Sequence, residues 1–160
     1  MEIVANASPL IGLARINKFY LLKELFGKVY IPAAVYQEVV IAGENEPGAD
    51  ETKTGIEKGW IEKEEVKDTL AVESLLSIIN IGEAEAIILA RELKVDRVLL
   101  DDLGARDEAH LLGLKVTGTI GILQLAMDIG MPISLKRELD NLKDAGFRIS
   151  DELYQKVLGL

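Results

Sequence analysis

The sequence predicts an α/β fold, a three-layer α/β/α sandwich with a mainly parallel central sheet. Short β-prone runs alternate with helical patterns almost throughout, which is the pattern of strands joined by crossover helices. One run, residues 98–100, is apolar throughout, as expected of a buried strand. The chain has 160 residues, 49% of them hydrophobic, which is enough for one domain with a sizeable core.

The elements follow one another in a regular order. The expected strands are residues 2–5, 29–31, 60–66, 98–100 and 115–117. The expected helices are residues 8–16, 19–26, 32–42, 69–78, 82–93 and 104–112, with a further one opening at 118–121. Ser8 followed by Pro9 is expected to cap and start the first helix. Residues 43–55, rich in Gly, acids and Thr, are expected to form a long loop.

The last part of the chain, residues 134–160, has the pattern of two amphipathic helices separated at Gly146. Ser134 and Ser150 are expected to cap them. Residues 1–160 are therefore expected to form a single domain with a C-terminal helical tail at 134–160.

The composition restricts the possible chemistry. Cys is absent and His110 is the single histidine, so thiolate and His-rich metal sites are excluded. A bound metal must be a hard cation held by oxygen: Mg²⁺, Mn²⁺ or Ca²⁺. The net charge of −9 excludes a broad basic face, but a site with several carboxylates carries surplus negative charge of its own. No run is long enough to span a membrane and no signal-peptide pattern is present, so a cytoplasmic location is expected.

Polar residues follow the predicted strands, where an open parallel sheet binds its ligands. Asn6 and Ser8 follow the first strand, Asp101 and Asp102 follow the fourth, and Thr119 follows the last. One explanation for the aspartate pair is that one of them caps the next helix. Because adjacent carboxylates repel each other, the pair at a strand end favours a cation site.

Three glutamates lie among apolar residues. Glu38 shares a helical stripe with small and aliphatic side chains, and a carboxylate buried there needs a partner or a metal; an exposed face is the alternative. Glu83 and Glu85 point about 200° apart, so both cannot face one site. Asn80 and Glu83 match a capping box, which favours Glu85 slightly as the site residue.

Two further residues are candidates for contact with a substrate. Arg106 lies one turn after Asp102 and is placed to meet either a phosphate or an acidic side chain. Thr119 opens a helix whose backbone amides are suited to phosphate, although a plain capped turn explains the same residues.

Several motifs together resemble the PIN-domain family, and more closely a branch related to the toxin subunit of VapBC-type toxin–antitoxin pairs. These motifs are VANASPLI at 4–11, IPAAVYQEV at 31–39, GEAEAIILA at 82–90, LLDDLGAR at 99–106, VTGTIGIL at 116–123 and GFRIS at 146–150. They cover essentially the whole chain. Each is loose by itself, but their common order is fairly specific.

The resemblance implies an endoribonuclease in which several acids bind Mg²⁺ or Mn²⁺ and activate water against a phosphodiester. Mapped onto this chain, the acidic positions of the family fall on Asn6, Glu38, either Glu85 or Glu83, and Asp102, with Asp101 assisting. Ser8, Arg106 and Thr119 are expected to contact the substrate. The family further implies RNA as substrate, an antitoxin protein as possible partner, and a homodimer. Residues of the tail would either contribute to such a dimer or complete the core: Leu135, Leu139, Leu142, Leu153 and Val157.

Asn6 departs from the family, in which many members have Asp at this position. An amide oxygen still binds metal but carries no charge, so weak or absent catalysis is expected. A PIN-like module that only binds RNA or a protein partner is therefore the alternative. A receiver-type phosphoryl-transfer domain is a third hypothesis, but it needs a nucleophilic Asp where Asn6 stands.

Overall fold

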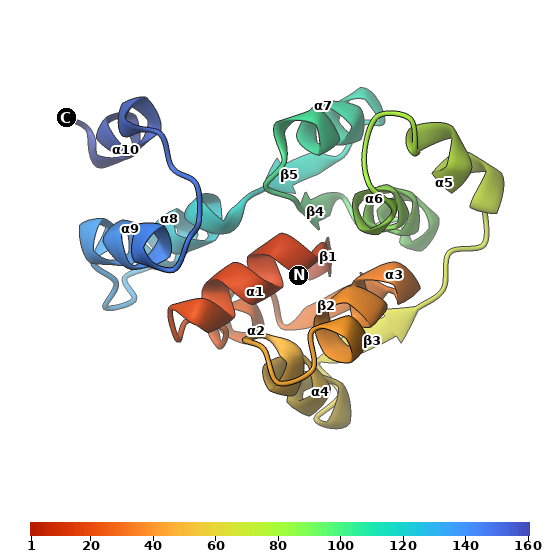
Figure 1. Ribbon diagram of the computed structural model, residues 1–160, viewed down its shortest axis with the longest axis horizontal. Coiled ribbons are helices and arrows are strands. Elements are labelled where there is room, and N and C mark those ends of the chain that lie inside the picture. Colours follow the sequence, from red (N-terminus) through yellow and green to blue (C-terminus); the bar gives the residue numbers. More distant parts are fainter.

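The centre of the molecule is a parallel five-stranded sheet. The computed structural model describes residues 1–160 and orders the strands β3-β2-β1-β4-β5, all parallel (Figure 1). Their bounds are β1 Glu2–Ala5, β2 Lys28–Pro32, β3 Ile61–Glu64, β4 Arg97–Leu99 and β5 Lys115–Thr117. The predicted parallel sheet is confirmed, with strand ends displaced by at most a few residues.

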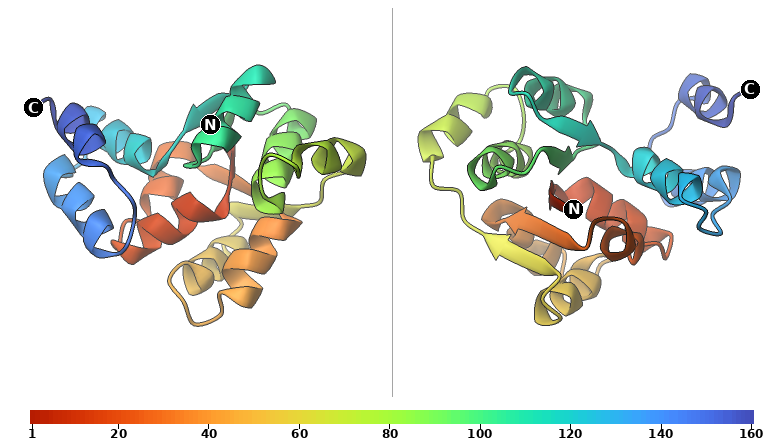
Figure 2. Two further views of the ribbon diagram at one scale, coloured as in Figure 1. Left: turned by 45° about the horizontal axis from the view of Figure 1, so that its top comes forward. Right: turned by 180° about the vertical axis from the view of Figure 1, so that it is seen from behind.

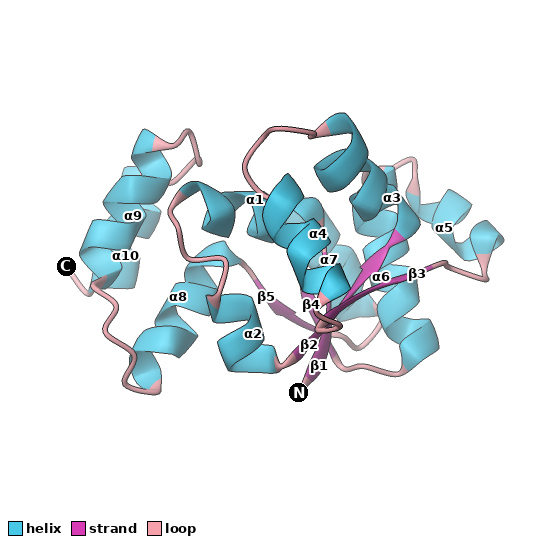
Figure 3. Ribbon diagram, turned by 90° about the horizontal axis from the view of Figure 1, so that it is seen from below, coloured by secondary structure: helices cyan, strands magenta, loops and turns pink.

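Helices cover both faces of this sheet, as the views in Figures 1 and 3 show. Before β4 the helices are α1 Ala7–Arg15, α2 Leu21–Phe26, α3 Ala33–Tyr36, η1 Gln37–Ala42, α4 Ala49–Glu57, α5 Thr69–Leu75 and α6 Ile81–Leu93. After β4 they are α7 Leu103–Leu111, α8 Thr119–Asp128, α9 Leu135–Asp144 and α10 Asp151–Leu158. The three-layer α/β/α sandwich expected from the sequence is therefore confirmed.

Side chains that alternate along β1 belong to two separate cores. Ile3 and Ala5 join a cluster with residues of α1, α2, α8 and α9. Val4, between them, joins a second cluster with residues of α5, α6 and α7. Because successive side chains of a strand point to opposite faces, the two clusters are the two packed interfaces of the sandwich.

The segment predicted as a long loop contains a helix. Residues 43–48 are irregular, but α4 begins at Ala49, and the Glu51 carboxylate accepts the Gly48 N–H at 3.2 Å. Fully buried Ala49 and Thr52 anchor α4 in the fold. The loop prediction was wrong here because tertiary burial of a few small residues outweighed the Gly- and acid-rich composition.

The helix predicted at 32–42 changes character midway. It begins as α3 and continues from Gln37 as the π-helix η1. The π-helix has a wider turn than the α-helix, and such segments are frequent at functional sites. Glu38 lies in this segment.

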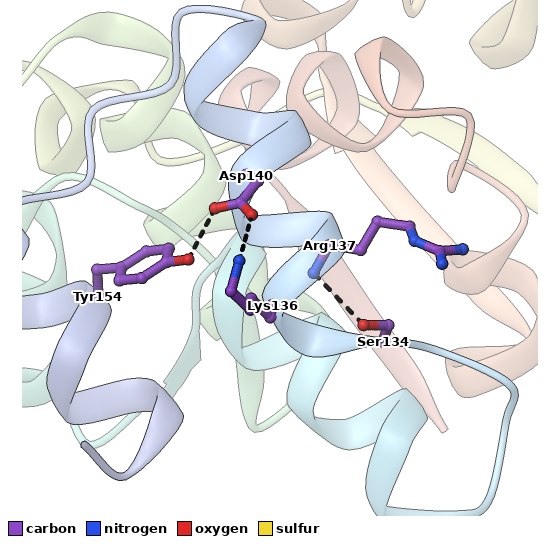
Figure 4. A network of polar contacts seen from close by, with 5 residues as sticks. All are labelled: Ser134, Lys136, Arg137, Asp140 and Tyr154. Atoms are coloured by element: carbon purple, nitrogen blue, oxygen red, sulfur yellow. Dashed lines mark hydrogen bonds and ion pairs between the residues drawn. The ribbon is translucent and has the colours of Figure 1, made fainter.

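The tail forms the two helices predicted for it. Ser134 caps α9, Ser150 caps α10, and Gly146 between them has a φ of +95°. Helix α10 buries none of its residues, and Figure 2 shows it joined to α9 by an extended connection. Asp140 of α9 accepts hydrogen bonds from the Tyr154 hydroxyl of α10 at 2.8 Å and from Lys136 at 3.0 Å (Figure 4).

None of the helices has the length and apolar character needed to cross a lipid bilayer.

Candidate metal and phosphodiester site

The site lies where the strand order reverses. β1 has β2 on one side and β4 on the other, so the chain's two halves diverge at the carboxyl ends of β1 and β4. Open parallel sheets bind ligands at this topological switch point. Asn6 follows β1 directly, and its backbone N–H donates to the Leu99 carbonyl at 3.1 Å. The backbone thereby holds Asn6 beside the Asp101–Asp102 corner.

A cavity of about 320 Å³ opens at this point, and we call it the acid cavity. It receives residues from β1–α1, η1, the start of α6 and the β4–α7 corner. Its lining residues are Asn6, Ser8, Ile11, Gly12, Glu38, Asn80, Glu83, Asp102 and Phe147. Three of the predicted carboxylates therefore line one cavity, although they are far apart in the sequence.

Asn6 is the most buried polar residue of the cavity. The residue is 5% exposed. Its side-chain amide makes no capping hydrogen bond to α1 and no other hydrogen bond within the protein. Buried amides usually have a partner, so an amide that lacks one and lines a cavity is suited to a ligand. Asn6 also takes the N-cap position that the sequence had assigned to Ser8, because α1 begins at Ala7.

Gly82 gives the cavity its room. A Cβ at this position would lie 3.2 Å from Asn6 Oδ1 and 3.6 Å from Glu38 Oε1. Asn6 Oδ1 and Glu38 Oε1 therefore both border the small space that a side chain at position 82 would fill. The sequence did not single out Gly82, because the need for a glycine here comes from Asn6 and Glu38, which are distant in the chain.

Glu83 is held at the base of the cavity. It completes the predicted capping box: its N–H donates to Asn80 Oδ1 at 2.8 Å, and its Oε1 accepts the Asn80 N–H at 3.0 Å. Burial raises the pKa of Glu83, with further upward contributions from the charges of Asp102 and Glu38, while the hydrogen bond from Asn80 opposes them. The capping role and a place in the site are thus compatible.

Glu85 does not reach this cavity. Its Oε1 accepts the Ala34 N–H at 2.9 Å, at the N-terminus of α3. The sequence separated the two glutamates by angle and slightly favoured Glu85, whereas in the structure Glu83 lines the acid cavity and Glu85 does not. The capping bonds of Glu83 with Asn80 are therefore compatible with a place at the cavity.

Glu38 enters the cavity from its rim. The sequence predicted a carboxylate on a buried stripe, but Glu38 is exposed, and Ile41 on the same stripe is 53% exposed. The stripe was inferred for an α-helix, whereas these residues form η1, whose wider turn shifts the faces. Glu38 therefore lines the site without the cost of full burial.

Asp101 organises three turns. Its Oδ2 accepts the Ser8 hydroxyl at 2.6 Å and the Thr119 hydroxyl at 2.7 Å, and its Oδ1 accepts the Thr119 N–H at 2.7 Å. These bonds connect the residues that follow β1, β4 and β5. With both oxygens engaged, Asp101 is suited to positioning the site rather than to holding a cation.

Thr119 does not meet the expectation of a substrate contact. It is fully buried, and both its hydroxyl and its N–H are committed to Asp101. Ser8 also donates to Asp101, but it is only partly buried and lines the acid cavity. The sequence could not show that the Asp101 carboxylate accepts hydrogen bonds from both Ser8 and Thr119.

Asp102 has two roles. Its Oδ2 accepts the Ala105 N–H at 3.0 Å and so caps α7, as the sequence allowed for one member of the pair. The residue is exposed and lines the acid cavity. A cap uses one oxygen and leaves the other available.

Arg106 stands beside the site, not in it. It lines a neighbouring cavity of about 420 Å³, here called the middle cavity, together with Ser8, Asp101 and Asp102. A Cβ on Gly118 would lie 2.9 Å from both Arg106 Nη1 and Asp101 Oδ1, so only a glycine leaves room for the guanidinium there. Arg106 forms no ion pair within 4.0 Å, which leaves its charge available.

The donor chemistry of the acid cavity suits a hard divalent cation, since Asn6, Glu38, Glu83 and Asp102 offer only oxygen. No three acids, however, gather closely enough in their present rotamers to surround one ion. The sequence predicted such a cluster, and the geometry gives a looser arrangement around a shared cavity.

Comparisons with known proteins agree with this architecture. A family model described as PIN domain matches residues 2–160. No curated protein gave a significant match to the chain. The family match spans every element of the sheet, the residues of the acid cavity and the tail. The chain therefore belongs to the PIN-domain family.

Proposed function

We propose that this protein is an endoribonuclease that depends on Mg²⁺ or Mn²⁺. The observation that carries the proposal is the acid cavity: Glu38, Glu83 and Asp102 from separate segments line it beside an amide, Asn6, that has no hydrogen-bond partner. PIN domains generally use divalent metals and act on RNA, and the oxygen-only lining suits these ions.

The residues of the site have different proposed roles. Asn6, Glu38, Glu83 and Asp102 would hold the cation, while Asp101 keeps the three strand-end turns in register through Ser8 and Thr119. Arg106 would bind a phosphate of the substrate. When bound, a divalent cation activates water and stabilises the charge that develops on the phosphodiester. Burial is the main cause of the raised pKa of Glu83, and the charges of Asp102 and Glu38 add to it; a bound cation would oppose both effects.

The test is the linkage between Mn²⁺ and stability, measured with RNA cleavage. At a Mn²⁺ concentration about 100 times Kd, binding should stabilise the wild type by about 2.7 kcal/mol. Asp102→Asn keeps an N-cap side chain for α7 but removes the charge, so it should lose most of this gain and the cleavage. Asp107→Asn removes an exposed charge from the same helix, outside the cavity, and should behave as wild type. Equal Mn²⁺ stabilisation of all three proteins, without RNA cleavage, would reject the proposal.

A second candidate function is a PIN-like module that binds RNA or a protein without cutting. Two observations favour it: the side chain of Asn6 carries no charge, and no three acids surround a common point. Asn6→Asp adds a charge at the most buried position of the cavity. Cleavage that appears only in Asn6→Asp would support this candidate, whereas full cleavage by the wild type would exclude it.

A toxin-like role, an antitoxin partner and a homodimer are further proposals. The tail leucines Leu135, Leu139 and Leu142 are buried in the core of the same chain, so they no longer support a dimer. Leu103 and Leu111 of α7 are 74% and 77% exposed and offer apolar surface instead. Sedimentation of the wild type and of Leu111→Ser would show whether this surface joins two copies.

A further inference from the structure

Beside the acid cavity, the connection between α9 and α10 carries an aromatic ring and a free cation. Gly146, at φ +95°, turns the chain so that Phe147 and Arg148 face the site. Phe147 lines both the acid cavity and the middle cavity, and Arg148 lines the middle cavity. These residues belong to the tail and not to any segment that supplies the acids.

The cavities form a continuous series. The acid and middle cavities share Ser8, Asp102 and Phe147. The middle cavity shares Arg106 and Gly118 with an outer cavity of about 610 Å³, which also contains Arg97. A path therefore runs from the carboxylates, past the ring, to three arginines.

Although the chain has a net charge of −9, none of these three arginines forms an ion pair with an acidic side chain. All four ion pairs within 4.0 Å are made by lysines. Arg97 donates to the Thr117 hydroxyl, whereas Arg106 and Arg148 donate no hydrogen bond. The outer cavity also contains one acidic residue, Asp128. Unpaired guanidinium groups beside a phosphodiester site favour an anionic polymer.

The Phe147 ring is held but not enclosed. Its backbone N–H donates to the Leu142 carbonyl at 2.9 Å, and its Cδ2 lies 3.7 Å from the point where a Cβ on Gly12 would stand. The side chain is only partly buried. One side of the ring therefore packs on α1 while the remainder borders the two cavities, which is the arrangement of a stacking platform for a base.

We propose that Phe147 and Arg148 are substrate-positioning residues: Phe147 stacks on the base next to the phosphate held in the acid cavity, and Arg148 binds the following phosphate. The inference rests on the proposed function for the identity of its ligand as RNA. It adds residues that the acid motifs do not contain, and it gives the tail a part in binding the substrate.

The experiment measures binding with Ca²⁺ in place of Mn²⁺, and gel analysis of the probes after binding checks that they are still intact. The probes are a fluorescein-labelled 12-nucleotide oligoadenylate and a ribose-phosphate oligomer of equal length without bases. The wild type should bind oligoadenylate about tenfold more tightly than the abasic oligomer, because one stacked base contributes on this scale. Phe147→Leu should abolish this preference, and Phe147→Trp should restore it. Thermal unfolding of each variant shows whether packing on α1 is retained.

Arg148→Gln should weaken both probes by the same factor and lower the salt dependence of binding by about 0.7 in log–log slope. Arg137→Gln removes an exposed arginine that points away from the tail contacts in Figure 4 and should change nothing. A preference for bases that survives in Phe147→Leu, or an absence of binding to both probes, would overturn the inference. Cleavage with Mn²⁺ is scored separately: base-dependent binding without cleavage rejects the nuclease and keeps the positioning residues.

Discussion

At the scale of single residues, the site depends on one missing side chain. Gly82 lies in the first turn of α6, where Ala is the better helix former by about 0.5–1 kcal/mol. Gly82→Ala would nevertheless place a methyl group 3.2 Å from Asn6 Oδ1 and 3.6 Å from Glu38 Oε1. We expect the variant to fold, with metal-free stability within about 1 kcal/mol of wild type, and to lose most of its Mn²⁺-dependent rise in Tm.

A matched glycine, Gly104, separates the effect of Gly82→Ala on helix propensity from its effect on the acid cavity. Gly104 lies in the first turn of α7, where an added Cβ would contact only Asp102 Oδ2, at 3.3 Å. Gly104→Ala should share the gain in helix propensity and retain more of the response to Mn²⁺. If Gly82→Ala responded to Mn²⁺ as fully as wild type, the cation would not lie between Asn6 and Glu38.

Glu83 predicts how stability depends on pH in the metal-free protein. Burial, and then the charges of Asp102 and Glu38, raise its pKa above the unfolded value. The native state therefore binds more protons than the unfolded state, and stability falls as pH rises from the unfolded pKa of Glu through the raised native one. Glu83→Gln keeps an oxygen for the Asn80 N–H but has no charge to bury. Chemical denaturation between about pH 4 and pH 8, a range that brackets the Glu titration, should show that this fall in stability is smaller in Glu83→Gln.

At the scale of elements, α10 has no fully buried residue, and Tyr154, Val157 and Leu158 pack against the core while the Tyr154 hydroxyl donates to Asp140. The hydrogen bond from Tyr154, together with the one from Lys136, lowers the pKa of Asp140. The stabilisation from Asp140 is therefore present above the unfolded pKa of Asp and is lost as pH falls through the lowered native value. Asp140→Asn should speed hydrogen exchange in α10 at neutral pH and leave the sheet unchanged, whereas Asp144→Asn, on the same helix without such bonds, should not. Equal exchange in both variants would mean that apolar contacts alone dock α10.

At the scale of the whole molecule, we predict that residues 1–160 unfold as one unit. Leu139 of α9 is fully buried in the same cluster as Leu13 and Ile122, so the tail shares the core of the sheet. Leu139→Ala should lower the free energy of unfolding by about 2–5 kcal/mol in a single transition, measured by calorimetry and denaturant titration. Leu160→Ala, at a position that is 84% exposed, should have little effect. Two separate transitions would instead make the tail an independent unit.

Most of the architecture could be predicted because it depends on local patterns. The alternation of strands and helices, the serine caps of α9 and α10, and the capping box at Asn80 all appear in short stretches of sequence. Features that depend on distant partners could not be predicted. The Glu85 carboxylate accepts the Ala34 N–H, the Thr119 hydroxyl donates to Asp101, and α4 forms where the composition indicated a loop.

The sequence by itself determined the class of the fold, because hydrophobic periodicity is a property of the chain, and it restricted a proposed metal site to oxygen ligands, because the chain has no Cys and a single His. The tertiary structure decided which carboxylates share the acid cavity. A helix turns by about 100° per residue, so the two positions between Glu83 and Glu85 of α6 separate facing the acid cavity from facing α3. The structure also brought Phe147, part of the GFRIS motif, to this edge, since the position of the tail against α1 is set by packing across the molecule.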